Sequence, residues 1–193
     1  MPIADFRALV PHPGVPAPPG IRVEAGARLE ADALRLVFRL AGDLAALRVP
    51  PPAPSAATDG LWQHTCFEAF AGRDDGDAYH ELNLAPSGAW AAYAFRAYRE
   101  RAPGAAIVRP PRVSVSRTAD AIVLEATLVL APLVRDRSLA PTRLGLTAVV
   151  EDAAGALSYW SLHHAPGPPD FHRADVRAIR LEASADPCEG GPA

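Results

Sequence analysis

Acidic, amide and aromatic side chains alternate with apolar ones along two neighbouring segments in the middle of the chain, residues 65–70 and 79–84. Glu68 lies in the first segment, and Glu81 and Asn83 lie in the second. Carboxylates accept hydrogen bonds from hydroxyl groups, an amide both donates and accepts, and aromatic rings offer flat apolar surfaces. This combination predicts a site for a small polyhydroxylated ligand, and a mono- or oligosaccharide fits that description best.

Two hairpins would bring these side chains together. We pair Phe70 with Tyr79 across the loop 71–78, which places Glu68 opposite Glu81. A four-residue turn at 85–88 then places Asn83 opposite Trp90. Because side chains alternate between the two faces of a sheet, Leu82 and Leu84 define a core face. The other face is expected to hold Cys66, Glu68, Phe70, Tyr79, Glu81, Asn83, Trp90, Ala92 and Ala94.

The expected ligand-binding residues fall into two groups. Five lie on the mixed face: Glu68, Tyr79, Glu81, Asn83 and Trp90. Five more could wall the site, although the sequence does not fix their positions: Trp62, Tyr98, Arg99, Trp160 and His172. The aromatic rings would stack on a sugar ring, and Arg99 would suit an anionic substituent such as the phosphate of a sugar phosphate.

Two carboxylates opposite each other repel unless a cation, a shared proton or ligand hydroxyl groups compensate them. Glu68 and Glu81 could therefore form a structural pair with an arginine such as Arg96 or Arg99, and the tryptophans could simply pack. The two carboxylates could also serve as acid–base residues of a small hydrolase or isomerase. A third alternative is a protein–protein adaptor. A closed cleft around Glu81 would favour the enzyme, a shallow groove the sugar binder, and a flat patch the adaptor.

Composition excludes several classes of function. The net charge is −3, so the chain has no basic field for nucleic acid. No segment is long and apolar enough to span a membrane. All 19 basic residues are arginine, which rules out a lysine Schiff base. HExxH, GxSxG and GxGxxG are absent, and His163 and His164 would point to opposite faces of a strand. We therefore expect no catalytic residue, no metal and no cofactor. The oligomeric state stays open.

The remaining pattern predicts an all-β protein. Its 21 prolines and 14 glycines punctuate short apolar segments. An antiparallel β-sandwich is favoured over a closed barrel, with residues 1–182 as one domain and 183–193 as a flexible tail. Short helices are expected only at 96–102 and 131–139. Strands are expected at 34–40, 47–49, 62–70, 79–84, 89–96, 112–117, 121–130, 144–151, 157–163 and 175–181.

Several motifs also resemble a known family. They are LWQHTCFEAF at 61–70, YHELNLAPSGAWAAYAF at 79–95, YR at 98–99, SYWSLHH at 158–164 and PDFH at 169–172. They resemble the bacterial DOMON-like proteins, which are related to family 9 carbohydrate-binding modules. The resemblance implies a β-sandwich that binds sugar or haem. Haem-binding relatives use a Met and a His as iron ligands, and the only Met here is Met1, so we expect no haem. The start of the chain lacks an apolar signal segment, and we expect a cytoplasmic protein.

Overall fold

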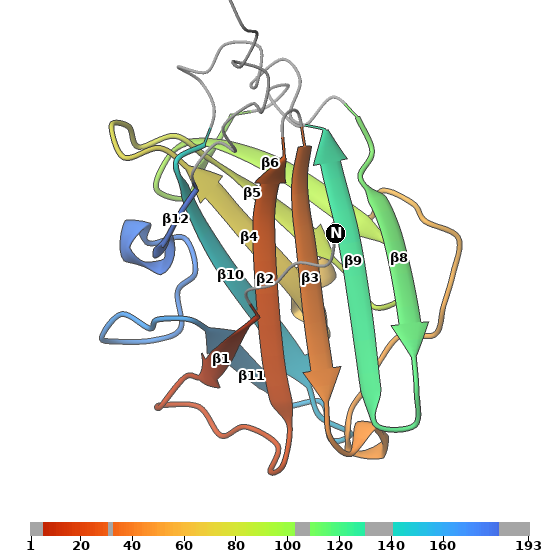
Figure 1. The fold of residues 1–193 in the computed structure, drawn as a ribbon. Coiled ribbons are helices and arrows are strands. Elements are labelled where there is room, and N and C mark those ends of the chain that lie inside the picture. The colour runs from red at the N-terminus through yellow and green to blue at the C-terminus, as the bar shows by residue number, and fades with distance from the viewer. Residues whose placement is uncertain (1–5, 31–32, 103–108, 130–140, 182–193) are drawn as a thin grey trace, which may run out of the picture.

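The protein is a β-sandwich. The structure, a computed structural model, describes residues 6–30, 33–102, 109–129 and 141–181. Its twelve strands form one continuous antiparallel sheet that folds over into two packed layers (Figure 1). The expected antiparallel sandwich is thereby confirmed. No helix in the described part of the chain has the length and apolar character needed to cross a membrane.

The first layer consists of four long strands that pair in the order β2-β3-β9-β8. Their bounds are β2 (Arg22–Glu30), β3 (Ala33–Ala41), β8 (Arg112–Arg117) and β9 (Ala121–Val129). Strand β1 (Arg7–Pro11) continues this layer at β2 and then pairs with β11, so it joins the two layers.

The second layer carries the polar face and pairs in the order β7-β6-β5-β4-β10-β11, with β12 beside β10. Its strands are β4 (Cys66–Gly72), β5 (Tyr79–Leu84), β6 (Trp90–Ala97), β7 (Glu100–Arg101), β10 (Arg143–Glu151), β11 (Leu157–Ser161) and β12 (Ile179–Arg180). Among the described residues, three short 3-10 helices lie in the connections: η1 (Leu44–Ala46), η2 (Leu61–Gln63) and η4 (Ala174–Val176).

The core lies between the layers, where alternate side chains of both meet. Phe38 of β3 stacks on Phe67 of β4 with ring centroids 5.0 Å apart. Leu82 and Leu84 of β5 belong to the same cluster, as their alternation predicts. Glu81 and Asn83, which alternate with these leucines, therefore point to the outer face of the second layer.

Several expected elements are corrected by the structure. Strands β1 and β2 were not expected. Residues 47–49 form only an isolated bridge, from Leu47 to Asp152. The expected helix at 96–102 is instead the end of β6 and strand β7, and residues 61–63 form η2 rather than strand. The expected helix at 131–139 and the tail lie outside the described residues.

The first hairpin differs from its expected register by two residues. Strand β4 extends to Gly72, which pairs with Tyr79, so the connecting loop is shorter than expected. A shift by two residues preserves the facing of every side chain but changes the opposed pairs. Glu68 consequently lies opposite Asn83, and Phe70 lies opposite Glu81. The two carboxylates are diagonal neighbours rather than a direct pair.

The second hairpin differs by one residue, and this reverses the facing of β6. Ala85 and Ala89 close the loop, because the Ala85 N–H donates to the Ala89 carbonyl at 2.9 Å. Only residues 86–88 form the loop, and Gly88 takes a positive φ of 97° there. Leu84 therefore pairs with Trp90, and Glu81 with Tyr93. The expected facing of β6 was wrong: Trp90, Ala92 and Ala94 point inward, and Ala91, Tyr93 and Phe95 point outward.

Candidate functional site

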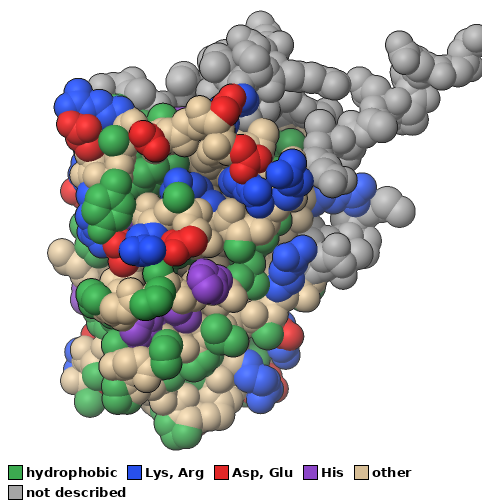
Figure 2. All heavy atoms as spheres, turned by 90° about the vertical axis from the view of Figure 1, so that its left-hand side faces the viewer, with side chains coloured by type: hydrophobic (Ala, Val, Ile, Leu, Met, Phe, Trp, Pro, Cys, Tyr) green, Lys and Arg blue, Asp and Glu red, His purple; other side chains and the backbone are tan. Residues whose placement is uncertain are grey.

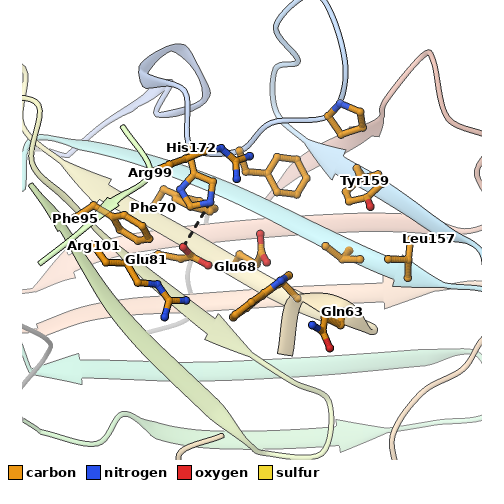
Figure 3. Close-up of a pocket in the computed structure, with 14 residues that line it drawn as sticks. Gln63, Glu68, Phe70, Glu81, Phe95, Arg99, Arg101, Leu157, Tyr159 and His172 are labelled. Atoms are coloured by element: carbon orange, nitrogen blue, oxygen red, sulfur yellow. Dashed lines mark ion pairs between the residues drawn. The ribbon is translucent and has the colours of Figure 1, made fainter. Parts of the chain in front are cut away.

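A cavity of about 450 Å³ lies on the outer face of the second layer (Figure 3). Strands β4, β5, β6, β10 and β11 form its floor. Helix η2, the β6–β7 hairpin and the loop before η4 form its walls. Its lining residues are Trp62, Gln63, Glu68, Phe70, Glu81, Phe95, Arg99, Arg101, Val149, Leu157, Tyr159, Pro169, Phe171 and His172.

Glu68 lies in the buried floor of the cavity, only 2% exposed. The Thr147 hydroxyl of β10 donates to its Oε2 at 3.2 Å. Burial raises the pKa of Glu68 to about 8, and the negative charge of Glu81 adds to this increase as a second, smaller cause. No arginine of the described chain forms an ion pair with Glu68 or Glu81: Arg96 pairs with Glu100 and Arg99 with Asp170. The geometry therefore does not support the alternative in which an arginine compensates Glu68 and Glu81 as a structural pair.

Glu81 reaches the cavity beside Glu68, from the neighbouring strand. The Asn83 side-chain N–H donates to Glu81 Oε1 at 2.9 Å, and Glu81 Oε2 lies 3.9 Å from His172 Nε2. Burial raises the pKa of Glu81, while the Asn83 hydrogen bond and the charges of Arg101 and Arg99 act in the opposite direction. The gap between Glu81 Oε2 and His172 Nε2 exceeds a direct hydrogen bond, so both atoms can bind one ligand hydroxyl.

The imidazole ring of His172 packs against three aromatic rings. Its ring lies edge-on to those of Phe70, Phe95 and Tyr79, with centroids 5.1–5.9 Å apart. Burial, with the charge of Arg99, lowers the pKa of His172 to about 4, so the ring is neutral at pH 7.

The protons around His172 can be assigned from its partners. The Arg99 backbone N–H donates to the Tyr79 hydroxyl oxygen at 3.1 Å, and that hydroxyl lies 2.8 Å from His172 Nδ1. The Tyr79 hydroxyl already accepts from Arg99, so we assign its own proton to the bond with Nδ1 and the one proton of the neutral imidazole to Nε2. His172 therefore presents an N–H donor toward Glu81 and the cavity.

Two arginines of the β6–β7 hairpin lie at the cavity wall. The Arg99 side chain donates to Asp170 at 2.9 Å, and Arg99 has a positive φ of 56° that these contacts hold in place. Arg101 lies over the Tyr93 ring at 4.3 Å and near the Trp62 ring at 5.8 Å. Within the described chain the Arg101 guanidinium forms no ion pair, so its N–H donors are available to a ligand.

The structure places the ten sequence-predicted residues in three kinds of position. Glu68, Glu81, Trp62, Arg99 and His172 line the cavity together. Tyr79 and Asn83 lie behind this lining, 2% and 0% exposed, and orient His172 and Glu81. Three lie elsewhere: Trp90, Trp160 and Tyr98.

Each of these three departures has a structural cause. Trp90 packs against the core on the inner face because of the one-residue shift of β6. Trp160 is also an inner-face core residue, and its indole N–H donates to Ser158 Oγ at 3.0 Å. Tyr98 sits at the tip of the β6–β7 hairpin, 57% exposed, and donates to Asp170 at 2.5 Å. It does not line the cavity.

Several lining residues were not expected from the sequence. Phe95 was expected on the core face, and the strand that holds Tyr159 was given no facing, so correct strand facing would have found both. Phe171 lies next to His172 in the PDFH motif and packs against Tyr159 with centroids 6.0 Å apart. Gln63 and Arg101 carry no such signal, because η2 and β7 were not expected.

A separate group of histidines lies beside β1, on the face shown in Figure 2. His164 Nε2 contacts the Val10 carbonyl at 2.8 Å, and its ring lies edge-on to that of His12 at 4.9 Å. Charged side chains of both signs lie near one another on the same face (Figure 2). In the ranges that the structure describes, no three His, Cys, Asp or Glu side chains are grouped so as to hold a metal ion.

Comparison with known proteins identifies the fold. No protein-family model matches the sequence, and no curated protein matches it either. A Bacteroides uniformis protein, provisionally assigned as carbohydrate-binding, superposes with a TM-score of 0.63 and 14% identity, over 93% of this chain and 85% of its own. A family 9 carbohydrate-binding module of Caldicellulosiruptor kristjanssonii superposes in its glucose complex with a TM-score of 0.58 and 12% identity, over 91% of this chain and 83% of the module. Its cellotriose complex gives 0.59 and 11%, over 98% and 87%. The chain has the sandwich fold of these carbohydrate-binding modules.

Proposed function

We propose that the protein binds a small polyhydroxylated ligand, a mono- or oligosaccharide, in the cavity on the outer face of the second layer. The observation that carries this proposal is that Trp62 lines the same cavity as the polar groups of Glu81, His172 and Arg101. An aromatic ring suits the C–H face of a sugar, and the polar groups suit its hydroxyls. The volume of about 450 Å³ lies in the range of small-molecule sites.

The likeness to carbohydrate-binding structures supports the proposal at the level of fold. Two of the similar structures are complexes with glucose and cellotriose. The finer relation to DOMON-like proteins is part of the proposal and rests on the sequence motifs. A protein–protein adaptor would present a flat apolar patch, whereas this site is a cavity with three walls. The shape argues against the adaptor alternative.

Arg101 narrows the ligand class. Its guanidinium is held by two aromatic rings and has no carboxylate partner in the described chain. Such a group binds a carboxylate or phosphate well, because charge-assisted hydrogen bonds to arginine are strong and can be bidentate. We therefore expect an acidic sugar, such as a uronic acid or sugar phosphate, to bind more tightly than its neutral counterpart.

The test is titration calorimetry with glucose, galactose, xylose, cellotriose, glucuronic acid and glucose 6-phosphate. Trp62→Ala should weaken binding about tenfold or more, since it removes an aromatic wall of the cavity. Trp90→Phe is the matched control, because Trp90 lies on the opposite face of the same sheet and should leave affinity unchanged. Binding of no sugar in the panel, or equal loss in both variants, would reject the site.

A further inference from the structure

We propose that this cavity is also catalytic: Glu68 as proton donor and Glu81 as proton acceptor interconvert the α and β anomers of a bound reducing sugar. The inference rests on the proposed function, because the sugar must first bind. It also selects, from the enzyme alternatives, an isomerase rather than a hydrolase. Four observations lead to it.

The first observation is that one hydrogen bond and two nearby positive charges favour the ionised form of Glu81. The Asn83 N–H donates to Oε1 at 2.9 Å, and the Nε2–H of His172 faces Oε2 at 3.9 Å. Arg99 and Arg101 line the same cavity and add positive charge. The Asn83 hydrogen bond and these positive charges stabilise the carboxylate and oppose burial, which raises the pKa of Glu81. Glu81 is therefore the proton acceptor of the pair.

The second observation concerns Glu68, whose surroundings favour a carboxylic acid. It is more deeply buried than Glu81 and has one neutral donor, Thr147, on Oε2. Asn83 lies directly opposite, and its side-chain oxygen is buried without a hydrogen-bond partner. A proton on Glu68 can be donated to a ligand oxygen in the cavity. The raised pKa of Glu68, about 8, agrees with this assignment.

The third observation is that both carboxyl groups project from the same face of the sheet (Figure 3). Glu68 pairs with Asn83, so Glu68 and Glu81 are diagonal neighbours, with Cα atoms roughly 7–8 Å apart. In glycoside hydrolysis two carboxyl groups flank the scissile bond. Here both groups approach a ligand from one side. The anomeric hydroxyl oxygen and the ring oxygen of a sugar are bonded to one carbon, so two groups on one side can serve both.

The fourth observation is that Glu68 and Glu81 can carry out every proton transfer that the reaction requires. Glu81 takes the proton of the anomeric hydroxyl, and that oxygen becomes the aldehyde carbonyl. The bond between C1 and the ring oxygen breaks, its electron pair stays on the ring oxygen, and Glu68 protonates that oxygen. After rotation about C1–C2, the new hydroxyl attacks the other face of the aldehyde. Glu68 recovers its proton and Glu81 returns its own to the carbonyl oxygen. Both residues end as they began.

The mechanism predicts a bell-shaped pH profile, because Glu68 must be protonated and Glu81 ionised. The groups that face the pair come from every element around it. Cys66 lies on β4, Arg99 and Arg101 on the β6–β7 hairpin, Tyr159 on β11 and His172 on the loop before η4. Glu151 on β10 is tied to Arg48 and His64. Activity should fall above about pH 8, where Glu68 loses its proton, and below the pKa of Glu81, which burial raises above its ordinary value.

The test measures anomer exchange by polarimetry and by exchange NMR in dilute buffer, with each sugar that calorimetry shows to bind. The protein should accelerate exchange above the buffer rate. Glu68→Gln and Glu81→Gln should each lower the catalysed rate by about 100-fold or more. Glu68→Gln retains an acceptor for Thr147 and a donor for Asn83, so it should fold. Glu24→Gln is the matched control, because Glu24 pairs with Arg39 in the other layer.

The outcomes separate the two proposals. If a sugar binds and its anomers exchange at the buffer rate, the catalytic inference is wrong and the binding function stands. Equal catalysis by wild type and both glutamine variants would also overturn it. If no sugar binds, the proposed function fails, and the inference fails with it. Catalysis that is lost in both variants while calorimetric affinity is kept supports the assigned roles.

Discussion

Replacing Glu68 with glutamine is expected to remove a pH-dependent loss of stability. Burial and the Glu81 charge raise the pKa of Glu68 from 4.5 to about 8. Between these values the folded protein keeps a proton on Glu68 that the unfolded chain has lost. Because the folded state binds more protons there, the free energy of unfolding falls as pH rises through this window and levels off above about pH 8.

The size of the effect follows from the pKa values. One pKa unit corresponds to about 1.4 kcal/mol, so the full displacement of Glu68 is at most about 5 kcal/mol. His172 acts in the opposite direction at acidic pH. Its pKa is lowered from 6.5 to about 4, so its contribution to stability increases as pH rises through that range. The informative window is therefore pH 6.5–8, in which the Glu68 contribution should fall by about 2 kcal/mol.

The assay is guanidinium chloride unfolding followed by tryptophan fluorescence, at half-unit steps from pH 6.5 to 8.5. The comparison with Glu68→Gln cancels the groups that titrate in both proteins. Wild type should lose about 2 kcal/mol relative to the variant as pH rises from 6.5 to 8. Parallel curves for the two proteins would refute the reasoning, because Glu68 would then be ionised in the folded state. The proton-donor role would fall with it.

Four further variants test other parts of the structure. Tyr79→Phe removes the hydroxyl that bonds His172 Nδ1 and the Arg99 N–H, and should cost about 1 kcal/mol and change the imidazole ¹⁵N shifts of His172; unchanged shifts would contradict the assigned tautomer. Gly88→Ala forces a side chain into a positive φ of 97° and should destabilise the fold by about 1–3 kcal/mol in denaturant unfolding, whereas a neutral effect would contradict the described turn. Gly145→Ala places a Cβ 2.9 Å from the Val176 carbonyl oxygen, so it should displace η4 and the adjoining loop, weakening sugar binding in calorimetry; unaltered affinity and stability would argue against this close packing. Arg101→Gln should abolish the preference for glucuronic acid over glucose, and a retained preference would assign the anion to another group.

The alternation of side chains predicted the polar face on β4 and β5, because that signal is local. Leu82 and Leu84 had to point into the core, so Glu81 and Asn83 had to point away from it. An error of two residues in the first hairpin left this result intact. The one-residue error in the second hairpin did not, because the loop has three residues rather than four, and Tyr93 and Phe95 therefore lie on the outer face in place of Trp90.

Other errors came from weak or ambiguous local patterns. In β2 the apolar face is Val23, Ala25, Ala27 and Leu29, and the small alanines make the alternation faint. In β11 the aromatic neighbours Tyr159 and Trp160 point to opposite faces, and either could have faced the core. In the structure Trp160 faces the core, and Ser158 on the same inner face accepts a hydrogen bond from its indole N–H.

The cavity itself depends on contacts that no local pattern encodes. Glu68, Asn83 and Thr147 lie on the outer face of a sandwich, where strands are usually solvated, yet all three are buried. Loops must therefore cover them, and a few distant ion pairs hold those loops. Glu151 joins Arg48 at 3.1 Å and His64 at 2.7 Å, and Asp170 joins Arg99 at 2.9 Å. The partners are 103, 87 and 71 residues apart in sequence. These pairs hold the walls of the cavity in place, and burial within those walls is the main cause that raises the pKa of Glu68.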